Sequence, residues 1–154
     1  MNFDNFTIKA QEAVNHSVKM AEGNNQQAIE TGHLLKGLMV NAESVIGFLL
    51  KKLGVNIPIF TAALDKIIQS YPKVTGGENY LSSASNSAIQ RATSISQKMG
   101  DQYVSVEHLL LGLLEGSDAV SRLMKDSGMG RKELEEAIKA VSYTHLTLPT
   151  KRIV

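Results

Sequence analysis

Apolar residues recur every three to four positions along most of the chain, and this spacing predicts a series of amphipathic α-helices. The first predicted helix carries one apolar stripe, which consists of Phe6, Ala10, Ala13, Val14, Val18 and Ala21. Three more stripes follow over residues 31–39, 43–53 and 57–68, and Gly54 stands where the third helix is expected to stop. Residues 73–79 are rich in Gly and polar residues without this period, so they are predicted to form a linker.

The second half of the chain repeats this order of elements, with helices predicted over residues 83–99, 105–114, 118–125 and 131–141. Segments 29–39 and 104–114 align at an offset of 75 residues, and five of the eleven positions are identical. The identical pairs are His33/His108, Leu34/Leu109, Leu35/Leu110, Gly37/Gly112 and Leu38/Leu113. We therefore predict an all-α fold of about eight helices, in which two four-helix repeats, 1–72 and 80–142, are related by a pseudo-twofold axis and pack as one bundle.

The last twelve residues, 143–154, lose the helical period and include Pro149, so we predict a non-native or disordered tail there. The whole chain has 16 basic and 15 acidic side chains, a formal charge of +1. Without Lys151 and Arg152 of the tail, the charge of residues 1–142 becomes −1. This balance argues against a protein that binds nucleic acid through phosphate contacts.

Composition narrows the class further. A hydrophobic fraction of 43% is too high for a disordered chain, and no apolar run is long enough to span a bilayer. The absence of cysteine removes disulfide frameworks and thiolate zinc sites, and residues 1–4 have no features of a secretory signal. We expect a cytoplasmic protein without a membrane partner.

The recurring His33 and His108 are the first candidates for metal binding, but one histidine in each repeat is a small ligand set without a Cys or His partner nearby. The preferred interpretation is a partly buried, hydrogen-bonded histidine in the first turn of a helix. Gly32 and Gly37 have the spacing of a phosphate-binding loop, yet the two residues that follow are not the required Lys and Ser or Thr. We therefore expect neither a metal nor a cofactor in this chain.

Asp101 and Glu107 flank the predicted start of the sixth helix. The preferred structural interpretation is a solvated loop acid and a first-turn glutamate that is stabilised by the helix dipole. The alternative is a small enzyme that uses them as a general acid and base, but no nucleophile or cofactor motif accompanies them. The residues alone therefore indicate a non-catalytic helical repeat domain that binds other proteins.

The duplicated His-Leu-Leu-x-Gly-Leu pattern resembles the N-terminal domain of the Clp/Hsp100 unfoldases, and within that group the ClpB-type disaggregases. The resemblance covers residues 1–142, and it rests on segments 2–7, 27–30, 33–35, 72–77 and 100–107. It implies a mobile client-recognition domain, which engages extended apolar segments of unfolded or aggregated proteins and passes them to an AAA+ motor. The full-length relatives use ATP and Mg, are expected to be hexamers, and work with the DnaK chaperone system. The isolated domain is expected to be a monomer.

The resemblance also assigns residues. Polar positions that the family links to chaperone activity fall on Thr7, Asp101 and Glu107, which implies that the starts of the first and sixth helices lie close together. The family's apolar groove beside the fifth helix maps onto Ile95, although Arg91 departs from its apolar pattern. A second hypothesis, the adaptor-docking N domain of a ClpC- or ClpA-type unfoldase, fits the opening segment and the linker less well.

Overall fold

The computed structural model describes residues 3–41, 43–74 and 76–146, and within them the chain forms eight helices. The first four are α1 (Ile8–Gly23), α2 (Thr31–Asn41), α3 (Glu43–Lys52) and α4 (Ile57–Gln69). The second four are α5 (Ser83–Lys98), α6 (Val106–Leu114), α7 (Ala119–Asp126) and α8 (Arg131–Leu146). The predicted all-α class and its eight helices are thereby confirmed.

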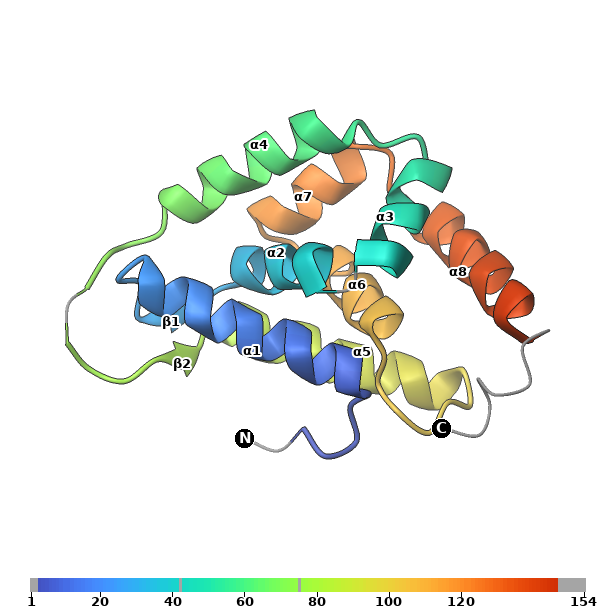
Figure 1. Cartoon of the computed structure of the whole chain (residues 1–154), viewed down its shortest axis with the longest axis horizontal. Helices are drawn as coiled ribbons and strands as arrows, with labels where there is room; N and C mark the ends of the chain where they lie inside the picture. Colours follow the sequence, from blue (N-terminus) through green and yellow to red (C-terminus); the bar gives the residue numbers. More distant parts are fainter. Residues whose placement is uncertain (1–2, 42, 75, 147–154) are drawn as a thin grey trace.

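The helices are arranged as the duplication requires (Figure 1). Within the repeats, α1 packs along α2, and α5 packs along α6 in the same way. Across the repeats, α4 contacts α7 and α3 contacts α8, which is the exchange that a pseudo-twofold axis produces. The two repeats therefore share one core.

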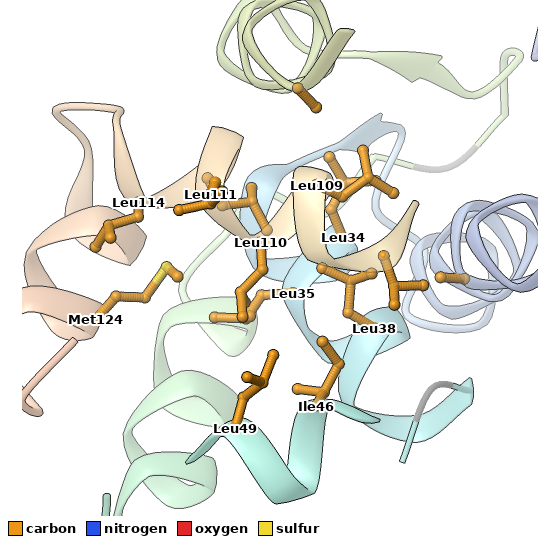
Figure 2. Close-up of a cluster of buried hydrophobic side chains, with 14 of the residues drawn as sticks. Leu34, Leu35, Leu38, Ile46, Leu49, Leu109, Leu110, Leu111, Leu114 and Met124 are labelled. Atoms are coloured by element: carbon orange, nitrogen blue, oxygen red, sulfur yellow. The ribbon is translucent and has the colours of Figure 1, made fainter. Parts of the chain in front are cut away.

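The shared core is built from the apolar stripes of the two central helices, α2 and α6. Leu35 and its repeat partner Leu110 are completely buried, and Figure 2 shows both pointing into the centre of the leucine cluster. Ile46 and Leu49 of α3 close the cluster from one side, while Met124 of α7 lies on another. Because each central helix contacts both repeats, neither repeat has a complete core without the other.

Two short extended segments, which the helical period does not reveal, join the repeats. Strand β1 (Ala28–Ile29) pairs in parallel with β2 (Tyr80–Leu81), and an isolated bridge pairs Phe6 with Val104. Phe6 precedes Leu81 by 75 residues, and Ile29 precedes Val104 by the same distance. Each repeat therefore pairs the segment before its first helix with the segment before the other repeat's second helix.

The last helix is longer than predicted, because α8 continues to Leu146 rather than ending near Val141. Residues 142–146 contain neither Gly nor Pro, so nothing in them forces the helix to end, and Pro149 comes only three residues later. The first four residues of the predicted tail are thus helical, while 147–154 lie outside the described residues. No single helix in the described ranges is long and apolar enough to cross a membrane; α2 and α3 pass that test only as a sharply bent pair.

Asp118 connects the repeats through a polar contact as well. Its Oδ1 accepts the backbone N–H of Ser121 and caps α7, while its Oδ2 accepts the Thr31 hydroxyl at 2.8 Å. We expect Asp118→Ala to lower the free energy of unfolding by about 2 kcal/mol, because it removes a helix cap and a charge-assisted hydrogen bond. Asn56→Ala, which removes only the cap of α4, is the matched control and should cost about 1 kcal/mol. Urea unfolding of both variants tests the difference, and equal losses would contradict it.

Candidate functional site

The three polar candidate residues lie in the two segments that meet at the start of α1. We call this place the first seam and define it as residues 3–8 together with residues 99–107. The backbone N–H of Thr7 donates to the Val104 carbonyl at 2.9 Å, and the N–H of Val104 donates to the Asn5 carbonyl at 2.8 Å. The predicted proximity of the starts of α1 and α6 is therefore confirmed.

Thr7 is positioned by its role as a helix cap. Its extended backbone precedes α1, and its hydroxyl accepts the N–H of Ala10 at 3.1 Å. The residue is half-buried. Ser82, 75 residues later, caps α5 through the N–H of Ser85 in the same way.

Asp101 is an exposed carboxylate with one buried partner. Its Oδ2 lies 2.8 Å from Nε2 of His108, whose side chain is almost completely buried. Nδ1 of that ring accepts the backbone N–H of Ser105 at 2.8 Å, so Nε2 carries the proton and donates to Asp101. The hydrogen bond to a neutral ring fixes the orientation of the carboxylate and leaves its negative charge at the surface.

The first repeat has the same arrangement of hydrogen bonds around its histidine, but a different side chain accepts from Nε2. Nδ1 of the buried His33 accepts the N–H of Glu30 at 2.9 Å, and its Nε2 donates to Oε1 of Gln26 at 2.7 Å. Burial lowers the pKa of His33 to about 4, which keeps the ring neutral. Gln26 and Asp101 occupy equivalent positions, but Gln26 is buried and uncharged whereas Asp101 is exposed. The prediction of a hydrogen-bonded histidine in the first turn of a helix is confirmed in both repeats, but both side chains are almost completely buried rather than partly buried.

Ser105, His108 and Asp101 together have the connectivity of a catalytic triad, since Ser105 Oγ lies 3.0 Å from Nδ1 of His108. Two observations favour a structural role. The same Nδ1 accepts a backbone N–H, and Ser105 Oγ accepts the N–H of His108 as the cap of α6. The equivalent set in the first repeat is Glu30, His33 and Gln26, which keeps the hydrogen-bond frame without a nucleophile.

Glu107 lies in the first turn of α6, where its carboxylate is half-buried and complements the positive end of the helix dipole. With Asp4 and Asp101, it gives the first seam three carboxylates, and residues 3–8 and 99–107 contain neither Lys nor Arg. Three or more potential metal-binding side chains do not cluster anywhere in the part of the chain that the structure describes. The seam is therefore acidic without a cation site of this kind.

Ile95 has a different environment from the three polar candidates. It is buried on α5 and lines a hollow of about 590 Å³ that none of Thr7, Asp101 and Glu107 lines. Apart from Ile95 and Met99, the lining of this hollow is polar or charged. Most residues that line the hollow beside the fifth helix are therefore polar or charged, and Arg91 is one of them. Its Nε donates to the Gly112 carbonyl at 2.9 Å.

Two exposed apolar side chains at the seam were not predicted from the sequence. Ile8, directly after Thr7, is 74% exposed, and Tyr103, directly before Val104, is 46% exposed. Their equivalents in the other repeat are Ser83 and Ala28. Ile8 lies outside the apolar stripe of α1, and this position is the feature of the sequence that could have indicated its exposure. The first seam thus offers exposed apolar side chains beside carboxylates, an arrangement suited to contact with another polypeptide.

The fold defines a duplicated helical domain in which the two repeats pack against each other. The model of the Clp repeat N-terminal domain matches residues 5–127, and the chain belongs to this family. It is 51% identical over 138 residues to the chaperone protein ClpB of Bacteroides thetaiotaomicron, an alignment that covers 90% of the chain but 16% of that relative. The chain thus spans about one sixth of the length of this ClpB protein.

Solved structures agree on the fold. The Hsp104 N-terminal domain of Candida albicans superposes with a TM-score of 0.76 at 20% sequence identity, over 87% of this chain and 89% of that one. A ClpV N-domain in complex with a VipB peptide superposes with a TM-score of 0.71 at 16% identity, over 86% and 83% of the two chains. At these identities the likeness shows the architecture alone.

Proposed function

We propose that this chain is the client-recognition domain of an ATP-dependent ClpB-type disaggregase. It binds extended apolar segments of unfolded or aggregated proteins and passes them to an AAA+ motor. The observation that carries the proposal is the backbone contact between Thr7 and Val104. It brings together two segments that carry a helix cap, two carboxylates and two exposed apolar side chains. The similarity to ClpB chaperones favours this function over the adaptor-docking N domain of a ClpC- or ClpA-type unfoldase.

The wider setting belongs to the same proposal. The motor supplies the ATP and Mg chemistry, the assembled protein is a cytoplasmic hexamer, and it cooperates with the DnaK system. The fragment itself acts by binding and not as an enzyme, because the serine, histidine and carboxylate at the seam are used as caps and ring supports. A small surface buries little area and an unfolded client loses entropy on binding, so we expect dissociation constants in the micromolar range or weaker, about −8 kcal/mol or less favourable.

The test is an NMR titration of the chain with a reduced, alkylated protein that cannot fold. We expect Thr7→Ala, Asp101→Asn and Glu107→Gln each to weaken binding about three- to tenfold, because each removes a polar group from the seam. The amides that shift in the wild-type chain should belong to residues 3–8 and 99–107.

Ser82→Ala is the matched control, since it removes the equivalent cap from the second repeat and leaves the first seam unchanged. Thr7→Ala and Ser82→Ala should each cost about 1 kcal/mol of stability, but only the former should weaken client binding. Asp101→Asn keeps an oxygen that can accept the hydrogen bond from Nε2 of His108. The variant therefore removes the negative charge without removing the hydrogen bond to the ring. Three folded variants that bind the client as tightly as the wild-type chain would overturn the site.

A further inference from the structure

A second surface, remote in sequence from the first seam, has the shape of a binding site. Helices α2, α3 and α4 enclose a hollow of about 600 Å³, which we call the first-repeat hollow. Its apolar lining residues are Met39, Val40, Ile46, Phe48, Leu50 and Ile57. Ile46 and Leu50 are buried and form its floor, while Val40 and Phe48 are 45% and 52% exposed at its edge. It shares no lining residue with the first seam.

The other repeat shows that this apolar surface is not a requirement of the fold. Val40 is equivalent to Glu115 at the offset of 75, and Ile57 is equivalent to Arg131 at the offset of 74 that Gly54 and Gly128 define. Arg131 forms an ion pair with Glu115, and its Nε lies 2.8 Å from Glu135 Oε2. The second repeat thus carries a charged pair where the first repeat has the exposed Val40 and the half-buried Ile57.

A further difference between the repeats lies at the edge of the hollow. Phe48 is equivalent to Arg122, so a large aromatic ring stands in the first repeat where the second has an exposed guanidinium. Exposed aromatic and aliphatic side chains around a concave surface are typical of sites that a partner covers. A fold that can place charged groups at three matching positions has no structural need for these apolar ones.

The charges around the hollow indicate the chemistry of its occupant. Lys36 and Lys51 are the charged residues among the described residues that line the hollow. Lys36 also pairs with Asp65 at 2.7 Å, outside the lining, whereas Lys51 is exposed in the last turn of α3. A carboxylate on the occupant can approach either ammonium group. A second copy of this chain is disfavoured, because a twofold contact would bring the same lysines together.

We propose that the first-repeat hollow binds a segment of a partner protein in which one or two large apolar side chains are flanked by carboxylates. The apolar side chains enter between Phe48 and Val40, and the carboxylates meet the lysines at the rim. This site is additional to the first seam, so the domain can hold an acidic, apolar segment of one polypeptide while the seam holds a client.

The test is a titration of the ¹⁵N-labelled 154-residue chain with two short peptides that differ only in their flanks. Both have leucine and phenylalanine at the centre, flanked by glutamates in one and by lysines in the other. We expect the glutamate peptide to shift amides within residues 36–61 and to bind at least tenfold more tightly than the lysine peptide.

Phe48→Arg copies the residue of the second repeat and should weaken binding of the glutamate peptide at least tenfold. Ile59→Arg is the matched control, because Ile59 is an exposed apolar residue of α4 outside the lining. This variant should bind the glutamate peptide as tightly as the wild-type chain does. Lys51→Glu, a change at an exposed side chain, is a second variant that should also weaken binding. Circular dichroism confirms that each variant is folded.

Four results would overturn the proposal. Equal affinity for the two peptides would show that the lysines do not contribute to binding. Equal affinity of the folded Phe48→Arg and Ile59→Arg variants for the glutamate peptide would show that the peptide does not bind in the hollow. Shifts confined to the first seam would show that the peptide is bound there as a client. A concentration-dependent dimer in sedimentation experiments, abolished by Phe48→Arg, would identify a second copy as the occupant instead. Failure of the seam variants to alter client binding would leave this proposal unaffected, since the two sites share no residue.

Discussion

Replacing Gly112 by alanine is expected to lower the free energy of unfolding by about 3 kcal/mol, which for a domain of this size corresponds to a fall in melting temperature of about 10 °C. Gly112 lies at the crossing of α5 and α6, where a β-carbon would overlap the carbonyl oxygen of Ala88 and lie 3.1 Å from the backbone nitrogen of Ala92. Backbone atoms of a packed helix cannot move aside as a flexible side chain can. The helices must therefore separate, and the leucine core between the repeats loses contacts.

The duplication provides a second example and the chain provides a control. Gly37, the repeat partner of Gly112, has the same close approach to the carbonyl oxygen of Ala13, so Gly37→Ala should be similarly harmful. Gly47→Ala introduces the same methyl group within α3, where no atom lies within 4 Å, and should raise stability by roughly 0.5 to 1 kcal/mol. Thermal melts of the three variants test the comparison. A loss below 1 kcal/mol at both crossings would show that the helices are not in tight contact.

The helices and the duplication were predictable because both are local signals. Apolar stripes, such as the one that ends at Ala21, can be read along the chain itself. Gly37 and Gly112 are identical because the same close helix crossing occurs once in each repeat. The strands were not predictable. Ala28–Ile29 and Tyr80–Leu81 are too short to show a period of two, and each strand is formed only because the other repeat supplies its partner.

The first seam was predictable in part. The resemblance identified Thr7, Asp101 and Glu107, and the structure explains how two segments distant in sequence meet there, through the pairing of Phe6 with Val104. The partners of the two histidines were not predictable, since Gln26 and Asp101 lie seven residues earlier in turns without regular spacing.

Acidification should destabilise the domain through His33. Burial lowers the pKa of this ring from 6.5 to about 4 in the folded chain, so the unfolded chain binds a proton more readily at every pH between these values. Stability is therefore retained above pH 6.5 and is lost as the pH falls towards 4. A difference of this size corresponds to about 3 kcal/mol between pH 7 and pH 4. The physical cause is the burial of the ring, which disfavours its charged form.

The contribution of His33 is isolated by comparing the wild-type chain with His33→Gln, because carboxylates also titrate in this range. Glutamine cannot titrate, so the variant should be less stable than the wild-type chain at pH 7, where the ring's two hydrogen bonds to Glu30 and Gln26 are missing. The difference in free energy of unfolding between the wild-type chain and His33→Gln should then decrease by about 3 kcal/mol as the pH is lowered to 4. Urea unfolding at pH 7, 5.5 and 4 measures it directly. A gap that stays constant over this range would mean that His33 binds its proton equally well in the folded and unfolded chains, and that its burial does not control the acid stability of the domain.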